Sequence, residues 1–304
     1  MRVLIAGGTG FIGSRLCESL LRDGQSIIIL TRNPHREKRS TADMQYVYWD
    51  PSKVSELKSV IEQADAVVNL AGTSIGTKRW TAARKKEILD SRIVSTGALV
   101  SAIAAADKKP SVMVSTSAIG IYDHTKEAVY HESSELGNDF LAEVCKTWER
   151  EARKVERTSV RLSIIRFGIV LGRLDGALKQ MLLPFKLFAG GPLGSGQQWM
   201  QWIHLDDAVG IIRFALENEN VSGVLNATSP NQVTNKEFSK VLGEVLRRPA
   251  FLPAPAFALR LMFGEMADVL LLNGQIVLPE RTLELGYRFQ YPDLEPALRN
   301  ILEK

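Results

Sequence analysis

The segment that most constrains the fold lies at the start of the chain. An apolar run, Val3 to Ala6, leads directly into Gly7-Gly8-Thr9-Gly10-Phe11-Ile12-Gly13. The residues from Phe11 to Arg22 then place Ile12, Leu16 and Leu20 four apart, which predicts an amphipathic helix. A buried strand, a turn with three spaced glycines and a helix, in this order, are typical of the first unit of a Rossmann-type nucleotide-binding sheet.

The three glycines have a physical role in such a turn. They let the backbone bend sharply, let a pyrophosphate approach without a Cβ in the way, and let the helix pack closely on the sheet. The amino end of the helix then faces the phosphates. We therefore expect the following residues of the turn to contact a dinucleotide: Gly7, Thr9, Gly10, Phe11, Ile12 and Gly13.

Short apolar runs alternate with longer amphipathic stretches, as in parallel strands joined by helical crossovers. The predicted fold class is α/β, a Rossmann-type doubly wound parallel sheet with a smaller, mostly helical C-terminal substrate-side region. The expected strands are Val3 to Ala6, Ile27 to Leu30, Ala66 to Leu70, Val112 to Ser115 and Ser163 to Phe167. The expected helices are Phe11 to Arg22, about Thr81 to Ala106, and Phe140 to Glu156.

We predict three regions along the chain. Residues 1–168 form an NADP-binding Rossmann domain, to which part of 199–230 returns. Residues 169–248 form a substrate-side region, where the alternation loosens and Gly190 to Gly196 predicts turns. Pro249, Pro253 and Pro255 then mark the start of a small C-terminal cap domain, 249–304.

The end of the second predicted strand indicates which dinucleotide is bound. A site for NAD places Asp or Glu there to bind the ribose 2′-hydroxyl, whereas this chain has Thr31-Arg32-Asn33. The Arg32 guanidinium is suited to bidentate pairing with a 2′-phosphate. More positive charge follows at His35, Arg36, Lys38 and Arg39. The predicted cofactor is therefore NADP(H), and a solvated basic loop is the alternative.

The composition excludes several classes of protein. A content of 45% hydrophobic and 24% charged residues is typical of a soluble globular protein, and the net charge of +4 is dispersed, which disfavours a nucleic-acid partner. No apolar run reaches the roughly 20 residues of a membrane helix, so we expect no membrane partner. The cysteines, Cys17 and Cys145, lie far apart and fit core thiols in a reducing compartment. The strand at Val3 leaves no room for a signal peptide, so we expect the cytoplasm.

The chain also resembles a known family. Gly7 to Gly13 and Asn69-Leu70-Ala71-Gly72 together resemble the extended short-chain dehydrogenase/reductase superfamily. Other segments resemble its atypical epimerase-like subgroup, the 39U group: Lys78-Arg79-Trp80-Thr81, Asp90-Ser91-Arg92, Phe140 to Cys145, Gly190 to Gly196 and Trp202-Ile203-His204. The C-terminal stretch, from Asn235 to Leu294, is similar to the terminal domain of that subgroup. The resemblance covers essentially the whole chain.

The resemblance implies an NADP(H)-binding protein of the epimerase or oxidoreductase type. Beyond the glycine turn, it implies cofactor contacts at Thr31 and Arg32 for the adenosine end, Leu70 and Ala71 after the third strand, Glu87 and Arg92 on the next helix, and Ile169 near the nicotinamide. For Glu87 and Arg92 the alternative is an exposed helix face. For Ile169 the alternative is core packing.

The catalytic residues of the superfamily are only partly present. Its chemistry needs a Tyr that exchanges a proton with the substrate, a Lys one helical turn later, and a Ser or Thr that holds the substrate oxygen. Ser117, with Ser115 as second choice, follows the fourth strand as expected, and a turn hydroxyl is the alternative. Lys146 lies on the next helix, but Ala142 stands four residues before it, and that helix carries no tyrosine.

A tyrosine and a lysine with the expected spacing occur elsewhere, at Tyr122 and Lys126. We interpret the pair as coincidental, because only a helix places residues four apart on one face, and this segment reads as a loop. Tyr122 alone stays a candidate proton donor, since open α/β sheets bind ligands at the carboxyl ends of their strands. Lys146 and Glu143 are further candidates, with a solvated helix face as the alternative for each.

The remaining motifs leave the reaction open. His124, His131 and His204 are too scattered for a metal site, so we predict no metal. Trp199 and Trp202 either stack on a ring-shaped substrate or fill the gap between domains. The leading interpretation is an NADP(H)-dependent oxidoreductase or epimerase acting on an unknown small molecule, a nucleotide sugar or a carbonyl compound. The rival is a non-catalytic NADP(H)-binding protein, such as a redox-responsive regulator.

Overall fold

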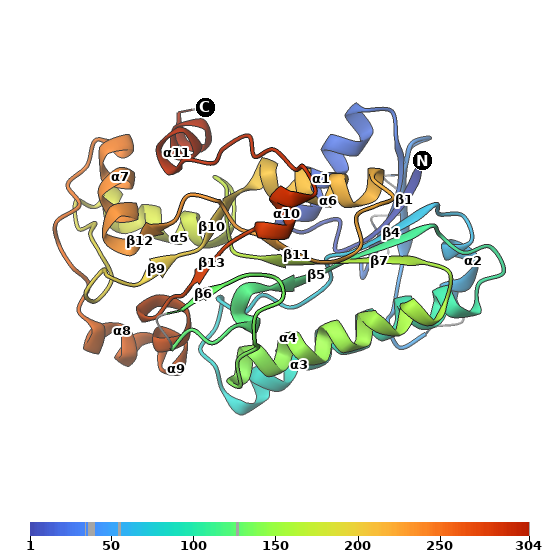
Figure 1. Cartoon of the computed structure of the whole chain (residues 1–304), viewed down its shortest axis with the longest axis horizontal. Coiled ribbons are helices and arrows are strands. Elements are labelled where there is room, and N and C mark those ends of the chain that lie inside the picture. Colours follow the sequence, from blue (N-terminus) through green and yellow to red (C-terminus); the bar gives the residue numbers. More distant parts are fainter. Residues whose placement is uncertain (34, 36–39, 54–55, 126–127, 304) are drawn as a thin grey trace.

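A seven-stranded parallel sheet forms the centre of the protein (Figure 1). The computed structural model describes residues 1–33, 35, 40–53, 56–125 and 128–303. The strands, in their order across the sheet, are β11 (Gly223–Ala227), β7 (Arg161–Phe167), β5 (Val112–Ala118), β4 (Ala66–Asn69), β1 (Arg2–Ala6), β2 (Ser26–Thr31) and β3 (Met44–Tyr48). The chain builds the sheet outward in both directions from β1, so the carboxyl ends of β1 and β4 flank the crevice where such sheets bind ligands.

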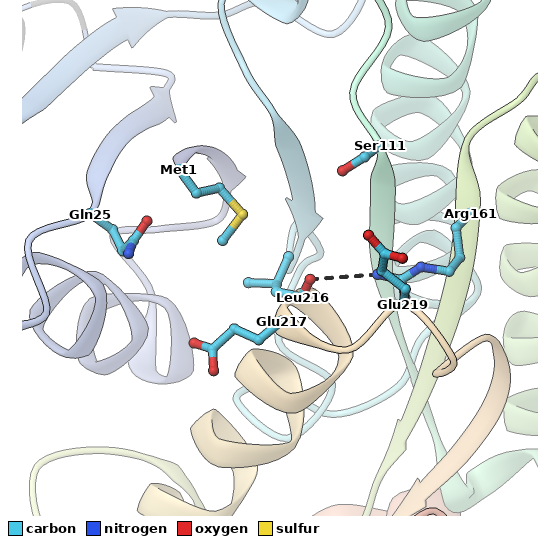
Figure 2. Close-up of a pocket in the computed structure, with 7 residues that line it drawn as sticks. All are labelled: Met1, Gln25, Ser111, Arg161, Leu216, Glu217 and Glu219. Carbon is cyan, nitrogen blue, oxygen red and sulfur yellow. Dashed lines mark hydrogen bonds between the residues drawn. The ribbon is translucent and has the colours of Figure 1, made fainter.

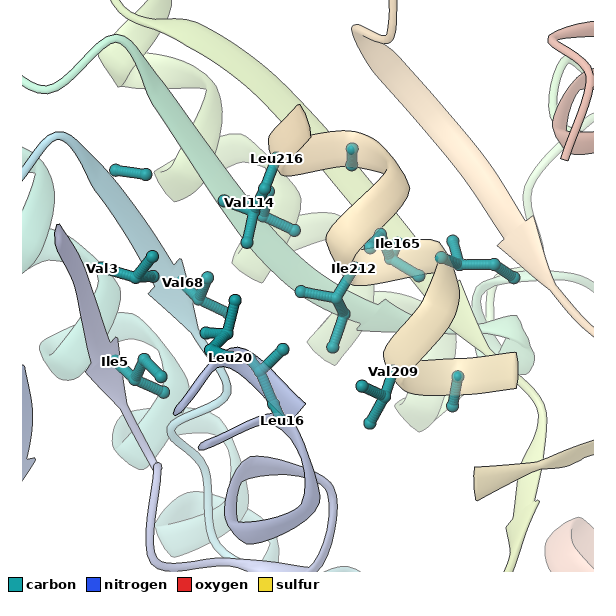
Figure 3. Packing of buried hydrophobic residues seen from close by; sticks show 14 of the residues in the cluster. Val3, Ile5, Leu16, Leu20, Val68, Val114, Ile165, Val209, Ile212 and Leu216 are labelled. Atoms are coloured by element: carbon teal, nitrogen blue, oxygen red, sulfur yellow. The ribbon is translucent and has the colours of Figure 1, made fainter. Parts of the chain in front are cut away.

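Helices cover both faces of the sheet, which explains why the strands are apolar throughout. On one face lie α1 (Phe11–Arg22) and α6 (Leu205–Glu217), and on the other lie α2 (Lys58–Ile61), α3 (Ala82–Ala105) and α4 (Phe140–Arg153). Figure 3 shows Leu16 and Leu20 of α1 and Ile212 of α6 meeting Val68 and Val114 of the sheet. The expected α/β fold class is confirmed.

The five expected strands all belong to this sheet, and two more strands complete it. β3 lies at one edge and pairs only with β2, so its side chains are half-exposed and its sequence lacks a strong apolar run. β11 lies at the other edge and contains the polar Asn226. Its position, together with that of α6, brings part of 199–230 back to the Rossmann sheet.

The region after β7 builds a second core. β8 (Ile169–Leu171) pairs with β10 (Trp202–His204), and β9 (Trp199–Met200) pairs with β12 (Val233–Thr234). These strands pack with α5 (Gly176–Lys186), α7 (Asn235–Leu246) and α11 (Leu294–Leu302). Trp202 is buried within this core, whereas Trp199 is exposed. The fully buried Trp202 ring therefore has a packing role.

The C-terminal region runs back across the molecule. It contains α8 (Ala256–Phe263), α9 (Glu265–Ala267), β13 (Ile276–Val277) and α10 (Glu280–Glu284), and β13 pairs with β6 (Val129–Tyr130). The buried Asp207 carboxylate of α6 accepts hydrogen bonds from the backbone N–H groups of Gln290 (2.7 Å) and Tyr291 (2.9 Å). Burial raises the pKa of Asp207. This carboxylate ties the chain end to the Rossmann domain.

One described helix, α3, is long and apolar enough to cross a membrane by composition alone. Helix α3 packs its inner face on the sheet, and 44% of its most apolar stretch is buried inside the molecule.

Candidate functional site

Two positions of the turn between β1 and α1 have room for no residue other than glycine. Gly7 has a φ of +84°, and a Cβ there would lie 2.7 Å from the carbonyl carbon and oxygen of Leu70. A Cβ at Gly13 would lie 2.2 Å from the carbonyl oxygen of Gly7. The Gly10 N–H donates to the same oxygen at 3.0 Å and closes the turn. The backbone of β1, the turn and α1 is thus held against the end of β4.

The amino end of α1 is open to an anion. Gly10 is its N-cap and offers no side-chain hydrogen bond, and the first turn carries no acidic residue. The first N–H groups of the helix therefore keep their donors for a ligand, as at phosphate-binding helix ends. Thr9 and Gly10 are exposed. The ring of Phe11 packs so closely on Gly172 that a Cβ there would lie 2.6 Å from it.

The end of β2 has the expected polar sequence in an accessible position. Thr31 is buried and its hydroxyl accepts from the N–H of Asn33 at 3.2 Å, which turns the chain. Arg32 is exposed, and residues 31–33 contain no carboxylate. His35 is exposed as well, whereas Arg36, Lys38 and Arg39 lie outside the described residues.

A buried polar network supports the end of β4. The Asn69 side chain accepts from the N–H of Ala71 at 3.2 Å and donates to the Thr96 hydroxyl at 2.8 Å. Thr96 in turn accepts from the Trp148 indole N–H at 2.9 Å. These bonds join β4, α3 and α4. They fix the conformation of Leu70 and Ala71, which are both half-buried.

The two residues of α3 that the resemblance pointed to differ in their surroundings. The Arg92 guanidinium donates to the carbonyl oxygens of Thr73 (3.0 Å) and Ile88 (2.9 Å), and burial lowers its pKa. No carboxylate of the described chain lies within ion-pair distance of it. Glu87 is more than half exposed and accepts from Arg84 at 2.7 Å. Arg92 is thus a half-buried cation beside the β4–α3 loop, and Glu87 lies at the surface.

Ser117, at the end of β5, faces a cysteine and not a lysine. Its hydroxyl is buried and has no hydrogen bond of normal geometry among the residues described. The Cys145 thiol of α4 lies beside it, and burial raises the pKa of that thiol to about 11. Lys146 points elsewhere and contacts Glu143 and, at 3.4 Å, Asn138. The structure therefore does not bring Lys146 to Ser117.

The rotation of α4 explains this result. The buried side chains of the helix include Leu141, Val144, Cys145 and Trp148, at the spacing of one helix face. Leu141, one turn before Cys145, packs in the same apolar cluster as Trp80. This face offers neither a phenol nor an ammonium group to a substrate. Cys145 is buried, as the sequence predicted for a core thiol.

Tyr122 belongs to a buried network. Its hydroxyl donates to Asn226 Oδ1 at 2.9 Å and accepts from Arg166 Nη1 at 2.7 Å, and its ring stacks on Tyr130. The side chain is fully buried, and burial raises the pKa of its phenol. Arg166 is held in turn by two bonds to Glu149, of 2.7 and 2.8 Å. These contacts favour a structural role for Tyr122 over the proton-donor role that the sequence left open. Lys126 lies outside the described residues.

We expect Tyr122→Phe to lower stability rather than to stop chemistry. The change removes one hydroxyl and leaves buried groups of Arg166 and Asn226 short of a partner, at a cost of about 1–3 kcal/mol. Urea unfolding measures the loss, and any turnover found should stay within about threefold of wild type. Unchanged stability together with abolished turnover would restore Tyr122 as the proton donor.

Two cavities lie away from the glycine turn. One, of about 530 Å³, is shown in Figure 2 and is lined by Met1, Gln25, Ser111, Arg161, Leu216, Glu217 and Glu219. These residues stand at the amino ends of the strands and at the end of α6, where Arg161 donates to the carbonyl oxygen of Ala215 at 2.9 Å. The other, of about 560 Å³, surrounds His131, Glu280 and Arg281. Neither lies at the ligand-binding edge of the sheet.

The histidines have local partners. His124 contacts Asp139 at 2.7 Å, and His131 contacts Ser133 at 3.0 Å. His204 caps α6, where its Nδ1 accepts from the N–H of Asp206 at 3.0 Å. In the part of the chain that the structure describes, no three His, Cys, Asp or Glu side chains cluster as metal ligands.

Comparison with known proteins identifies related sequences over the whole chain. The model of the NAD dependent epimerase/dehydratase family matches residues 3–227, and a domain of unknown function, DUF1731, matches residues 254–301. The chloroplastic epimerase family protein SDR39U1 homolog of Arabidopsis thaliana is 45% identical over 305 residues, which cover 100% of this chain and 87% of the plant protein.

Solved structures agree with this similarity. Human epimerase family protein SDR39U1 (isoform 2), crystallised with NADPH, is 39% identical and superposes with a TM-score of 0.90 over 100% of this chain and 99% of the human one. A nucleoside-diphosphate sugar epimerase from Corynebacterium glutamicum is 29% identical, with a TM-score of 0.79 over 99% of this chain and 58% of that one.

Proposed function

Because this chain belongs to the NAD dependent epimerase/dehydratase family, together with the proteins named SDR39U1, we propose that it is an NADP(H)-dependent oxidoreductase or epimerase. It transfers a hydride at a carbon atom that bears an oxygen. The observation that carries the proposal is the turn that excludes any Cβ at Gly7 and Gly13 and presents an uncapped helix end. The human relative, which was crystallised with NADPH, supports the choice of cofactor.

The residues at the crevice fit such a cofactor. The open amino end of α1 would hold its pyrophosphate, and Leu70 and Ala71 would line its path past β4. Arg92, a half-buried cation with no carboxylate at ion-pair distance among the described residues, would gain a compensating partner from the bound ligand. The cofactor supplies or accepts the hydride. Ile169, at the start of β8, would lie near the nicotinamide of the cofactor. Glu87, which is exposed, would contact the cofactor only at the surface of the protein.

Arg32 selects the phosphorylated dinucleotide in this proposal. We expect Arg32→Ala to weaken NADPH binding by about 10- to 100-fold, the value of one or two charge-assisted hydrogen bonds, and NADH binding by less than about threefold. Fluorescence titration of each nucleotide measures both. Arg22→Ala, which removes an exposed cation from the end of α1, controls for the general field. Equal weakening of both nucleotides would contradict the assignment.

Ser117 is the side chain that we assign to the substrate oxygen. Its buried hydroxyl has no hydrogen bond of normal geometry among the described residues, whereas the Ser115 hydroxyl accepts one from the Asn69 side chain at 3.5 Å. The neighbouring Cys145 thiol, with its pKa near 11, stays neutral and does not compete for a proton at neutral pH. Ser117 is thus free to donate to a substrate carbonyl or hydroxyl.

An apolar wall lies on the same face of α4, one turn before Cys145. Leu141, Trp80 and Met266 pack together there, and the Trp80 indole donates to the Ile75 carbonyl at 2.9 Å. Such a wall keeps water from a hydride donor. The substrate class in this proposal is a nucleotide sugar or another small carbonyl compound, in line with the name of the related Corynebacterium structure. The compartment is the cytoplasm, where the unpaired thiols of Cys17 and Cys145 persist.

Turnover tests this function. Absorbance at the NADPH band, followed with a panel of nucleotide sugars, ketones and aldehydes, should reveal at least one substrate. Ser117→Ala should then lower kcat/KM by about a hundredfold, as loss of one donor to a reacting oxygen does, with NADPH affinity unchanged. Ser59→Ala, which removes the hydroxyl of an exposed serine of α2, serves as the control. Equal activity of Ser117→Ala and wild type would remove Ser117 from the site.

One observation favours a second candidate function. The face of α4 at Ser117 carries Leu141 and Cys145 in place of a phenol and an ammonium group. A protein that only binds NADP(H) and responds to the redox state of this cofactor needs neither the phenol nor the ammonium group. Tight NADPH binding without turnover of any compound in the panel would favour this non-catalytic role.

A further inference from the structure

The part of the chain after β7 exposes a group of large apolar side chains. They come from the end of α5, from the segment before α8 and from α8 itself. We call them the apolar face: Leu183, Leu187, Phe188, Phe251, Leu252, Phe257, Leu261 and Met262. Phe251, Phe257 and Leu261 are 73%, 74% and 78% exposed. Soluble proteins rarely expose so many large apolar side chains together without a binding partner.

The two segments of the apolar face are joined through the backbone. The N–H of Leu252 donates to the carbonyl of Gly190 at 3.2 Å, and the N–H of Gly194 donates to the carbonyl of Ala254 at 2.9 Å. The Arg248 guanidinium lies 4.7 Å from the centre of the Phe188 ring. The segment after α5 and the chain that leads into α8 are therefore adjacent, and Figure 1 places α8 at the edge of the molecule.

The local backbone also exposes these residues. Phe188 has a φ of +60°, a left-handed conformation that is unfavourable for an aromatic residue, and its side chain is nevertheless exposed. In α8 Leu259 is buried and Phe263 packs on the cluster of Trp80 and Met266, whereas Phe257, Leu261 and Met262 are exposed. Packing within this chain explains neither the left-handed backbone of Phe188 nor the exposed apolar side chains of α8.

The charges on the apolar face are all of one sign. Residues 176–189 and 247–262 contain five charged side chains and no carboxylate: Lys179, Lys186, Arg247, Arg248 and Arg260. Acidic side chains stand just outside these segments, at Asp175, Glu244, Glu265 and Asp268, and Asp268 pairs with Arg260 at 2.9 Å. The rest of the chain mixes both signs, with 34 acidic residues against 38 basic ones overall. The partner of this face is therefore expected to be anionic.

We propose that the apolar face docks on the surface of a lipid membrane that contains anionic headgroups. Leu, Phe and Met side chains rimmed by Lys and Arg are typical of elements that lie in the membrane interface. The cations would contribute about 1 kcal/mol each near an anionic surface. A second copy of the chain would instead bring two cationic rims together.

This docking replaces the expectation from the sequence that no membrane takes part. That expectation considered only spanning helices, whereas the apolar face needs no helix to cross the bilayer. It becomes continuous only when residues about sixty apart in the sequence are joined by the hydrogen bonds between 190–194 and 252–254. It is also independent of the cofactor and of turnover.

Vesicle binding tests the proposal on the full chain. Wild-type protein should sediment with large unilamellar vesicles of equal parts phosphatidylglycerol and phosphatidylcholine, and much less with phosphatidylcholine alone. The variant Phe257→Ser with Leu261→Ser should lose at least about tenfold in partition, because each side chain contributes on the order of 1 kcal/mol when it enters the interface. Lys179→Glu with Lys186→Glu should lose binding to a similar degree, and about 1 M salt should weaken the wild type.

The matched control is Val94→Ser, which removes an exposed apolar residue of α3 and should leave partition unchanged. The two double variants, Phe257→Ser with Leu261→Ser and Lys179→Glu with Lys186→Glu, should keep the melting temperature and the NADPH affinity of the wild type. Failure of the wild type to bind anionic vesicles would overturn the proposal. So would a dimer in light scattering that Phe257→Ser with Leu261→Ser dissociates, which would assign the face to a second copy. Binding of polyglutamate as tight as that of the vesicles would assign it to an acidic protein.

Discussion

Gly7→Ala should abolish NADPH binding and destabilise the fold by about 3 kcal/mol. The new Cβ would lie 2.7 Å from the main chain of Leu70, where no flexible side chain can move aside, and the φ of +84° is unfavourable for alanine. The turn must shift, so the open donors of α1 lose their alignment with the pyrophosphate. Loss of two such hydrogen bonds weakens affinity more than a hundredfold. Fluorescence titration and urea unfolding measure the two effects.

Gly24→Ala separates the two causes. Gly24 also has a positive φ, +71°, but no atom lies within 4 Å of its Cβ position. This control should lose about 1 kcal/mol of stability and none of its NADPH affinity. Should Gly7→Ala bind NADPH as tightly as Gly24→Ala does, the turn is not the pyrophosphate site and the proposed function fails with it.

Glu149→Gln should cost about 3–5 kcal/mol of stability, the largest loss that we expect from a single polar substitution. Arg166 and Glu149 are both nearly inaccessible and are joined by two bonds of 2.7 and 2.8 Å. Burial alone would lower the pKa of Arg166, but the bonds and charge of Glu149 outweigh it and hold this pKa above its usual value. Without Glu149 the guanidinium stays charged, buried and uncompensated. Differential scanning calorimetry and urea unfolding measure the result.

A surface pair offers the matched control. Arg153 and Glu156 lie 3.4 Å apart near the end of the same helix, and both are more than 40% exposed. Glu156→Gln should change stability by less than about 1 kcal/mol, because water screens such pairs. Equal effects of the two substitutions would show that the Arg166 network is not a buried support of the fold.

The fold was largely predictable from local patterns. The five runs of apolar residues and the glycine turn identified the central strands, because strands buried on both faces read as continuous apolar segments. α1 was predicted to within a residue, since its apolar stripe and the turn before it agree. β3 and β11 were not identified as strands, because each lies at an edge and needs fewer apolar residues.

The candidate site was predictable only in part. The sequence pointed to the turn, Arg32 and Ser117, each of which follows a strand and so lies at the ligand-binding edge. It also pointed to Lys146 and Tyr122, and the structure places the first at the surface and the second in a buried network. The nature of a side chain suggested chemistry in both cases. The surroundings of the two side chains favour structural roles, and their catalytic assignments stay predictions.

The sequence by itself determined the fold class, the family and the residues of the glycine turn, because these depend on neighbours along the chain and on backbone sterics. Only the tertiary structure decided which side chains of α4 face Ser117, because the rotation of a helix follows from the apolar surface that it buries. It also decided that two distant cationic and apolar segments form one face. Such a surface arises only when packing elsewhere in the molecule brings its parts together.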